Sequence, residues 1–422
     1  MHNIREAAFW TLDGIRGGSV RKVYLQLREM RDQSTPNTAA LTEILRYAGE
    51  HVPYYQNITA DALDAFPVID KTVIKRDYSA FRSLEFQDDA KLTVHHTSGS
   101  SGTPFKAFRD PGKEIWHKAG LILQDEEIGW NVGDRWAHMR NWGFGAPATA
   151  KERFMKNMVP LSVLNLDDEK LEKIVQTLLT DRKLQIVLGY ASALERLARY
   201  IDDHYDEATD FGLKLIIADS DNLKQSAWDA LERIFKCQVL NRYANIENGI
   251  IAITKPGDRT FYTNQSQVYV EVLKPDADAS VSEGEMGRIV ITDLHNKAMP
   301  FIRYDTGDLA VAKKIVGGQC VALASLQGRA ISSLRRTDGV LLSETNIMGR
   351  FKEFTEIGRY QIIQKSADEY EMLLESTPES ADARCAAELK KIFGDDARVT
   401  IRHTDHIPLR ESGKFPVTVS EL

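Results

Sequence analysis

Apolar positions in the middle of the chain recur with the spacing of strands and of helices in turn. Residues 186–188 form a short apolar run typical of a buried strand, and apolar residues at helical spacing follow over 194–201. The succession repeats with a strand predicted over 213–218, a helix over 228–235 and a strand that includes 239–240. This repetition predicts parallel strands joined by right-handed crossovers.

The pattern changes on either side of this region. Before it, residues 38–50 carry apolar side chains on one helical face behind Asn37 and Thr38, which are good helix caps. Beyond about residue 260 the helices stop, and we expect short strands over 268–273, 288–292, 309–314 and 320–326. These strands indicate a β-rich subdomain attached to the parallel core.

A second change of composition follows Gly328 and Arg329. The pattern beyond it predicts two strands, a helix and a last strand, over 360–363, 370–374, 386–393 and 399–402. The predicted fold class is α/β, with a large N-terminal domain over residues 1–329 that contains a parallel βαβ core and a β-rich subdomain at about 260–329. A small, mobile α+β domain is expected over 330–422.

The charge of the chain narrows the classes of partner. A formal net charge of −7 over 422 residues provides no dense basic surface, which argues against nucleic-acid binding, whereas a small anionic ligand needs only a local site. No window approaches the roughly 18 apolar residues of a membrane span, and Arg5, Glu6 and Asp13 interrupt any N-terminal apolar stretch. We therefore expect a cytoplasmic protein without a membrane span.

Cysteine and histidine spacing gives no support to a metal cluster. The three cysteines, Cys237, Cys320 and Cys385, lie far apart without a CxxC pair, and the ten histidines are scattered. Neither a disulfide framework nor a structural zinc site is expected.

A loop rich in glycine and hydroxyl groups follows the apolar residues 92–94. It consists of Thr97, Ser98, Gly99, Ser100, Ser101, Gly102 and Thr103. Glycines let backbone N–H groups approach an anion and hydroxyls add donors, so the loop suits a polyphosphate, to which Lys106 would add a point charge. No Lys-Ser or Lys-Thr pair follows the last glycine, which disfavours a P-loop ATPase or kinase. A flexible surface loop is the alternative.

Two further segments carry groups suited to a nucleotide. Residues 242–248 follow a buried strand, where open α/β sheets bind ligands; Tyr243 suits stacking on a base and Glu247 suits Mg²⁺. In residues 303–308 we predict a turn whose two aspartates accept ribose hydroxyls, and Arg329 beyond it suits phosphate or ribose oxygens. The alternatives are a core tyrosine, a solvated glutamate and a plain Asx turn.

A last segment lies close to the end of the chain. Residues 407–415 contain Lys414 beside Gly413. A lysine on such a loop is a mobile cation, able to neutralise charge in a phosphoryl-transfer transition state. A frayed basic tail is the alternative.

In this order the five segments resemble those of the adenylate-forming superfamily of acyl-CoA ligases, peptide-synthetase adenylation domains and luciferases. More narrowly, the chain is similar to the phenylacetate-CoA ligase branch, including its relatives in capsular polysaccharide biosynthesis. Residues 51–55, His-Val-Pro-Tyr-Tyr, and 66–71, Phe-Pro-Val-Ile-Asp-Lys, resemble the entry segment of that branch. The resemblance extends over nearly the whole chain.

The resemblance implies an activity and a set of roles. An enzyme of this family activates a small-molecule carboxylic acid with ATP and Mg²⁺ as an acyl-AMP, releases pyrophosphate and passes the acyl group to an acceptor. By similarity, the loop from Thr97 to Thr103 wraps the ATP phosphates, Glu247 binds Mg²⁺ and Lys414 acts in adenylation. The adenine and the ribose are assigned to Ala218, Asp219, Ser220, Tyr243, Asp308 and Arg329.

The chain departs from the family pattern at three places. Ile246 replaces the threonine of the Tyr-Gly-x-Thr-Glu motif and so removes one hydroxyl. The aspartate that commonly follows Gly-Arg is absent from residues 330–334, where Ser332 is the candidate hinge, and Leu409 stands where the family more often has proline. Because the lysine, the glutamate and the ribose aspartate are all present, we still expect a catalytic protein.

The acyl pocket is assigned by similarity to His138, Arg140, Trp142 and Phe144. Two aromatic rings suit an apolar acid, whereas Arg140 suits a polar or charged one. CoA is the first expectation for the acceptor. The alternatives are acyl or aminoacyl transfer to a sugar or carrier in surface polysaccharide biosynthesis, and a non-catalytic nucleotide-binding protein.

Overall fold

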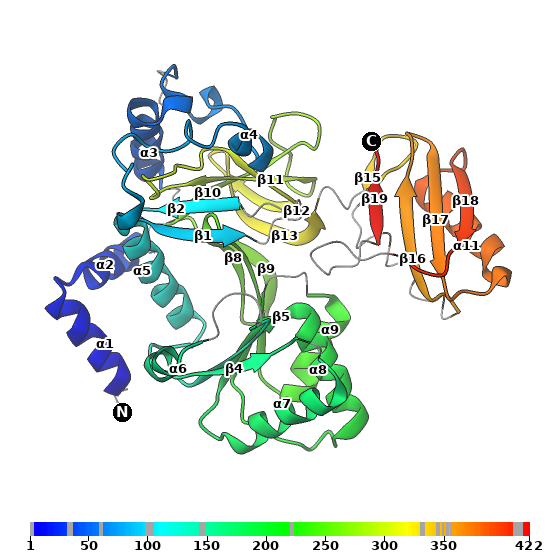
Figure 1. The fold of residues 1–422 in the computed structure, drawn as a ribbon, viewed down its shortest axis with the longest axis horizontal. Helices are drawn as coiled ribbons and strands as arrows, with labels where there is room; N and C mark the ends of the chain where they lie inside the picture. The colour runs from blue at the N-terminus through cyan, green and yellow to red at the C-terminus, as the bar shows by residue number, and fades with distance from the viewer. Residues whose placement is uncertain are drawn as a thin grey trace.

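One large sheet organises most of the chain (Figure 1). The computed structural model describes residues 4–31, 37–58, 62–97, 105–142, 148–164, 166–219, 223–329, 334–342, 347, 350–351, 354, 356–407 and 417–422. Within these residues the sheet has the strand order β10-β11-β12-β13-β9-β8-β7-β6-β5-β3-β4. Its two halves differ in the direction of their strands.

The half that ends at β4 is parallel. Its strands are β3 (Trp136–Arg140), β4 (Met158–Ser162), β5 (Ile186–Tyr190), β6 (Leu215–Asp219) and β7 (Gln238–Asn245). Residues 186–188 and 215–218 are buried, which explains why these strands appear in the sequence as continuous apolar runs. The predicted βαβ core is confirmed, with β6 beginning two residues later than predicted.

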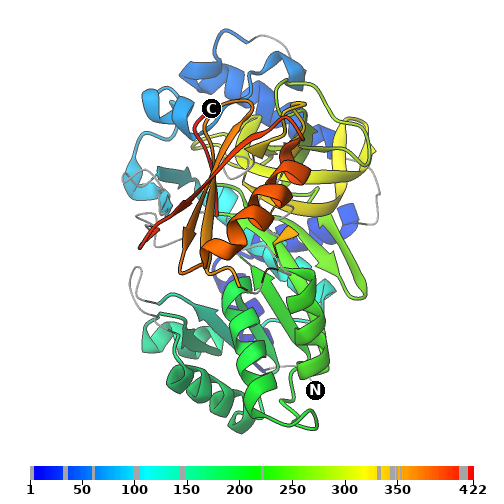
Figure 2. The ribbon, with the colours of Figure 1, turned by 90° about the vertical axis from the view of Figure 1, so that its right-hand side faces the viewer.

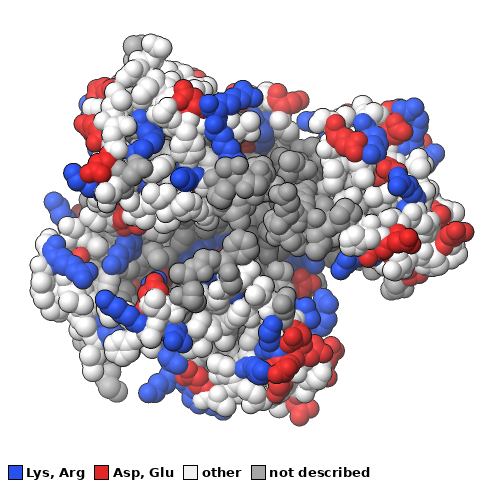
Figure 3. Space-filling view, viewed as in Figure 1, with Lys and Arg blue, Asp and Glu red and all other residues white. Residues whose placement is uncertain are grey.

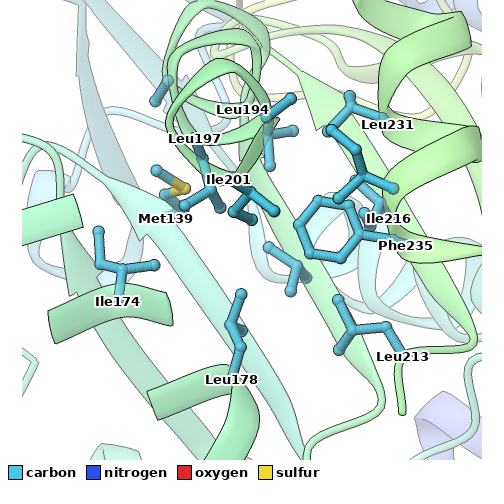
Figure 4. Packing of buried hydrophobic residues seen from close by; sticks show 14 of the residues in the cluster. Met139, Ile174, Leu178, Leu194, Leu197, Ile201, Leu213, Ile216, Leu231 and Phe235 are labelled. Atoms are coloured by element: carbon cyan, nitrogen blue, oxygen red, sulfur yellow. The ribbon is translucent and has the colours of Figure 1, made fainter. Parts of the chain in front are cut away.

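Three helices cover one face of the parallel strands. They are α7 (Asp168–Thr180), α8 (Ala191–His204) and α9 (Gln225–Phe235). Figure 4 shows Leu194, Leu197 and Ile201 of α8 pointing toward Met139 of β3 and Ile216 of β6, and all five belong to one buried cluster. Close packing makes such side chains costly to shorten, by about 2–5 kcal/mol for Leu to Ala. This layer of helices therefore holds the parallel strands in place.

The other half of the sheet is antiparallel. Its strands are β8 (Gly249–Lys255), β9 (Asp258–Thr263), β10 (Val268–Leu273), β11 (Met286–Asp293), β12 (Tyr304–Val316) and β13 (Gln319–Arg329). The four strands predicted beyond residue 260 are present, most of them longer than predicted. The strand-rich region begins earlier than predicted, because β8 and β9 follow β7 directly.

The turn predicted at residues 303–308 lies within a strand, because residues 304–308 begin β12. Asp305 Oδ1 nevertheless accepts a hydrogen bond from the Gly307 N–H at 2.8 Å, as in an Asx turn. The pairing of β11 with β12 shifts there: Val290 faces Asp305, while Arg288 faces Leu309. Gly307 has a φ of 75°, a value that favours glycine, and it accommodates the irregularity inside the strand. Asp and Gly thus mark a kink in the sheet at this position.

The N-terminal part packs helices and a hairpin against this framework. The helices are α1 (Ile4–Ile15), α2 (Ser19–Arg31), α3 (Thr38–His51), α4 (Lys71–Arg76), α5 (Pro111–Glu127) and α6 (Ala150–Lys156), and the hairpin is β1 (Thr93–Thr97) with β2 (Phe105–Arg109). Asn37 caps α3 as predicted, accepting a hydrogen bond from the Ala40 N–H at 3.2 Å. None of the described helices is long and apolar enough to cross a membrane.

A small sheet with its own core forms the last part of the chain, to one side of the rest in Figure 1. Its order is β18-β17-β16-β19, from β16 (Arg359–Gln364), β17 (Glu369–Glu375), β18 (Arg398–His403) and β19 (Thr418–Ser420); a short pair, β14 (Leu334–Arg335) and β15 (Leu341–Leu342), precedes it. Figure 2 shows α11 (Asp382–Phe393) crossing its outer face. The predicted α+β class is confirmed, but β18 is not the last strand. The boundary at 329/330 and the mobility stay predictions.

Charged residues of both signs are interspersed on the face shown in Figure 3. Lys and Arg there form no continuous band over the described residues. An anionic ligand on this side would meet local cations rather than a broad basic surface.

Candidate active site

The candidate site begins at the carboxyl ends of the parallel strands. Tyr190 and Asp219 end β5 and β6 side by side, and Ala218 pairs with Asn241 of β7. Strand β7 continues beyond this edge to Asn245, where it turns back into β8. Open α/β sheets bind ligands beyond such an edge, so the residues at the end of β7 are well placed.

Tyr243 and Asp308 are brought together across the sheet. The Tyr243 hydroxyl donates a hydrogen bond to Asp308 Oδ2 at 2.7 Å and lies 3.2 Å from Thr306 Oγ1. Tyr243 and Asp308 are half-buried, whereas Thr306 is buried. The two segments assigned to adenine and ribose therefore meet at one place.

Glu247 lies almost fully buried, with 2% of its surface exposed. Its Oε1 atom lies 2.6 Å from Lys71 Nζ and accepts a hydrogen bond from the Tyr304 hydroxyl at 3.0 Å. Lys71 is the first residue of α4, which Asp70 caps by accepting from the Val73 N–H. A buried carboxylate is stable only when paired and hydrogen-bonded, and Lys71 and Tyr304 supply both contacts.

Contacts of the neighbouring backbone fix the position of Glu247. Arg109 Nη2 donates to the Ile246 carbonyl at 2.6 Å, and Asn245 Oδ1 accepts from the Asn248 N–H at 2.7 Å. Gly249 has a φ of 90°, and a Cβ there would lie 2.8 Å from His117 Nδ1. Glycine is therefore required at this turn, which holds the glutamate beside the hairpin β1–β2.

The predicted phosphate loop connects the strands of that hairpin. Thr97 ends β1 and faces Phe105 of β2, and the loop is followed by a strand, where a P-loop would lead into a helix. Lys106 is exposed on β2 and pairs in register with His96. Lys71 Nζ lies 5.6 Å from the centre of the Phe105 ring, so the hairpin adjoins the Glu247 contacts.

Several predicted residues lie outside the described part of the structure. They are Ser98, Gly99, Ser100, Ser101, Gly102, Thr103, Phe144, Ser220, Ser332 and Lys414, together with the side chains of Thr97 and Arg329. The backbone of Arg329 is described: it ends β13 and pairs with Asp308 of β12. Ala218 and Asp219 end β6 beside β7. The roles assigned to all these residues remain predictions.

The residues assigned to the acyl pocket lie on and just after β3. Arg140 is positioned 4.9 Å from the Trp142 ring, whose Nε1 donates to the His138 carbonyl at 3.1 Å. Burial, together with Arg140 and Arg242, lowers the pKa of His138 to about 3, so the imidazole is neutral near pH 7. Polar groups thus accompany the aromatic ring at the end of β3.

Among the described residues, Glu247 is the carboxylate placed to hold Mg²⁺. No group of three or more His, Cys, Asp or Glu side chains suited to a metal ion occurs among the described residues. Both contacts of Glu247 are made to Oε1, which leaves Oε2 for a cation. This set fits Mg²⁺, which usually combines one or two carboxylates with water and substrate phosphate oxygens.

Sequence reasoning missed the residues that support the site. Lys71 and Tyr304 both fall within segments singled out above, but neither received a role. The contact of Lys71 with Glu247 joins segments far apart in the chain, and no local pattern reports it. Asp125 was also missed. Its signal was a charge on an otherwise apolar face near the end of α5: Ile122 and Ile128, three residues before and after Asp125, are both buried.

The fold defines a structural class: the architecture is that of the adenylate-forming CoA ligases. An open conformation of 2-hydroxyisobutyryl-CoA ligase, solved with 2-HIB-AMP and CoA, has a TM-score of 0.62 to this chain. The two sequences are 19% identical, and the match covers 88% of this chain and 90% of the ligase chain. At this identity the similarity establishes the fold.

Sequence comparison confirms the predicted resemblance to the adenylate-forming superfamily. Residues 334–421 match the family model of the CapK C-terminal domain. The chain is 21% identical over 284 residues to protein CapK of Staphylococcus aureus, covering 63% of this chain and 59% of CapK. It is 22% identical over 286 residues to phenylacetate-coenzyme A ligase of Pseudomonas putida, covering 63% of each protein. The chain thus spans less than two thirds of either relative.

Proposed function

We propose that this protein activates a carboxylic acid with ATP as an acyl-AMP and then transfers the acyl group to an acceptor, for which CoA is the first candidate. The observation that carries the proposal is the convergence of Tyr243, Asp308 and Glu247 at the carboxyl edge of the parallel strands. Two of these residues form a direct hydrogen bond and the third is a buried, oriented carboxylate. The reaction belongs in the cytoplasm, where ATP and CoA are available.

The nucleotide would lie against Tyr243 and Asp308. The ring of Tyr243 offers a face for adenine, and its hydroxyl is already fixed by Asp308. An ionised Asp308 has acceptor capacity beyond the Tyr243 bond, as two ribose hydroxyls require. Backbone of Ala218, Asp219 and Ser220 would border the adenine, and Arg329 would add a contact to the ribose.

The phosphates would lie between the loop Thr97–Thr103 and Glu247. Backbone N–H groups and hydroxyls of the loop, with Lys106, would bind phosphate oxygens. Glu247 would hold Mg²⁺, whose charge offsets that of the phosphates. Lys71 and Tyr304 keep the glutamate oriented. Ile246 is 42% exposed and adds no hydroxyl to this group.

In the first step a carboxylate oxygen of the acid attacks the α-phosphorus of ATP, and pyrophosphate leaves. In the second, an acceptor such as the CoA thiol attacks the acyl carbon, a proton is lost from sulfur, and AMP leaves. Lys414, carried into the site by the domain 330–422 turning about Ser332, would neutralise charge in the first step. Bringing two anions together requires this neutralisation and positioning.

A second candidate acceptor is favoured by the match of residues 334–421 to the CapK C-terminal domain. In this version the acyl or aminoacyl group passes from AMP to a sugar or a carrier in surface polysaccharide biosynthesis. The activation step is the same. Product formation from a preformed acyl-AMP, with CoA and with amino sugars in parallel, distinguishes the acceptors.

The test is carboxylate-dependent exchange of pyrophosphate into ATP, measured with Mg²⁺ and without an acceptor. We expect exchange with one class of acid, and its loss in Lys414→Ala but not in Lys390→Ala, a change at an exposed lysine of α11. Exchange at the parent rate in Lys414→Ala would show that the lysine has another role. ATP binding without exchange across a broad acid panel would support a non-catalytic nucleotide-binding protein.

A further inference from the structure

A group of buried polar atoms lies on the side of β7 opposite Tyr243. Its members are Arg242 of β7, Asp125 of α5, and His138 and Arg140 of β3. The function proposed above leaves Arg242 and Asp125 without a role. Several of their polar atoms have no hydrogen-bond partner among the residues that the structure describes.

Arg242 is the clearest case, since only 7% of it is exposed. Its Nη1 atom lies 3.8 Å from Asp125 Oδ1, which is an ion-pair distance too long for a hydrogen bond. Its Nε and Nη2 atoms have no hydrogen-bond partner within the described part of the chain, and neither does Asp125 Oδ1. Buried polar atoms are nearly always hydrogen-bonded, so two unmet guanidinium donors indicate a missing acceptor.

The strand register places this arginine at the site. Met139 pairs with Gly189, Tyr190 with Asp219, and Ala218 with Asn241. One residue further along, Arg140, Tyr190, Asp219 and Arg242 therefore form a row at the carboxyl edge. Because side chains alternate between faces, Arg140, Asp219 and Arg242 face away from Met139 and Ala218, which pack under the helices α7 to α9. The half-buried Tyr190 ring at the end of β5 still packs against that cluster.

The charges of Arg140 and Arg242 both contribute to the low pKa of His138, so the two arginines lie near that histidine. Arg140 Nε has no hydrogen-bond partner among the described residues. Asp219, the carboxylate in the row, has another interaction partner, and the carboxylate that the structure pairs with Arg242 is Asp125.

Helix α5 carries further polar side chains near this group. Asp125 lies one helical turn beyond Leu121, which lines a cavity of about 10 Å³ together with His117, Asn248, Ile250, Asn264 and Gln267, room for one water molecule. Asn248 Oδ1 and Gln124 Oε1 have no hydrogen-bond partner among the described residues. Both atoms are acceptors, so the donors that an anion needs come from Arg242 and Arg140.

We propose that the acid activated by this protein carries a second carboxylate, which Arg242 binds through Nε and Nη2, with Arg140 close by. Neighbouring N–H donors on one edge of a guanidinium match the two oxygens of a carboxylate. The assignment rests on the proposed function: ATP lies on the Tyr243 side of β7 and the acyl chain on the Arg242 side. The substrate class is thus a dicarboxylic acid, of which one carboxylate is adenylated.

The test uses matched pairs of acids in the pyrophosphate exchange assay. Each dicarboxylate from malonate to adipate is compared with the monocarboxylate of equal chain length. We expect kcat/KM to be higher for one dicarboxylate than for its partner by roughly 100-fold, the effect of a charged hydrogen bond left unmade at a buried site. Because this comparison uses the unaltered protein, it does not depend on any variant folding.

The variant Arg242→Met should remove the preference, mainly by raising KM for the dicarboxylate. Arg233→Met changes an exposed arginine of α9 paired with Asp202, and it should keep the preference. If Arg242→Met does not fold because Asp125 loses its partner, the double variant Arg242→Met with Asp125→Asn is assayed in its place, because it removes both charges together. Thermal unfolding of each variant identifies the folded ones.

The outcomes separate the two proposals. Exchange with monocarboxylates as good as with dicarboxylates, unchanged in Arg242→Met, would overturn the dicarboxylate assignment and leave acid activation intact. Exchange with no acid would overturn the activation, and the assignment with it. An effect of Arg242→Met on KM for ATP alone would place a phosphate at Arg242 and equally refute the assignment.

Discussion

The Tyr243 hydroxyl donates a 2.7 Å hydrogen bond to Asp308 Oδ2 across 65 residues of sequence. The contact joins β7 to β12, so a nucleotide that stacks on one residue meets the other already oriented. Orientation of a site before binding reduces the entropy lost when the ligand is bound. The hydrogen bond is therefore expected to matter for affinity rather than for the chemical step.

Tyr243→Phe tests this expectation, because it keeps the ring and removes the hydroxyl. We expect KM for ATP to rise by roughly 3- to 10-fold, the effect of one hydrogen bond, with kcat little changed. Tyr262→Phe is the matched control: its hydroxyl donates to Asp258 on the same strand, β9, away from the site. A loss of kcat alone in Tyr243→Phe would refute a role in ATP affinity.

Lys71 is expected to act by positioning Glu247. Lys71→Met leaves that buried carboxylate with the Tyr304 hydrogen bond only, so the exchange rate should fall by roughly 10- to 100-fold and require more Mg²⁺. Titration of the exchange rate with Mg²⁺ measures the effect. Lys71→Arg should restore part of it, whereas Lys75→Met, on the exposed part of α4, should behave like the parent. An unchanged Mg²⁺ requirement in Lys71→Met would contradict the positioning role.

The fold was predictable where local pattern and tertiary burial agree. Strands β5 and β6 are buried on both faces, so their apolar runs are visible in the sequence. Residues 304–308 contain the Asp and Gly of a turn, yet Tyr304 and Asp305 pair with β11 and Asp308 pairs with β13. Local turn preference is weak compared with the hydrogen bonds of a sheet interior, so the turn is reduced to an irregularity within the strand.

The site was predictable only as separate segments. The types of Tyr243, Glu247 and Asp308 suggested their chemistry, because aromatic rings and carboxylates have few uses at a strand end. Two further contacts depend on how α4 and α5 pack against the sheet: the ion pair of Lys71 with Glu247 and that of Arg242 with Asp125. Such contacts between distant segments have no period or spacing in the sequence.

Two half-buried histidines, His295 and His117, should make the protein sensitive to mild acid. Burial lowers the pKa of His295 to about 4, with Lys113 adding to the effect and Asp293 and Glu43 opposing it; burial likewise lowers the pKa of His117 to about 4. An unfolded histidine has a pKa of about 6.5, so between these values the unfolded state binds more protons. The stability contributed by neutral histidines is therefore present above about pH 6.5 and is lost as the pH falls toward 4.

Thermal unfolding between pH 7 and 4 checks this acid sensitivity. The Tm should fall steadily below pH 6.5, and His295→Gln should show a shallower dependence, because one such group is removed. His204→Gln, at an exposed position near the end of α8, should retain the parent slope. Equal slopes in the parent and in His295→Gln would show that His295 does not titrate as its burial predicts.

Lys113 and Asp293 form a fully enclosed ion pair, with both side chains 0% exposed and Nζ 2.7 Å from Oδ2. Asp293 Oδ1 also accepts hydrogen bonds from the N–H groups of His295 and Asn296, so the pair fastens α5 to the end of β11. Lys113→Met leaves the carboxylate buried without a cation and should lower the free energy of unfolding by about 3–5 kcal/mol. Urea unfolding measures this loss. Lys118→Met, at an exposed position of the same helix, should change it by less than about 0.5 kcal/mol.

Because a buried charge without its partner is the expected cause, the double variant Lys113→Met with Asp293→Leu should be more stable than Lys113→Met alone. A double variant less stable than Lys113→Met would instead indicate that the hydrogen bonds accepted by Asp293 outweigh its charge.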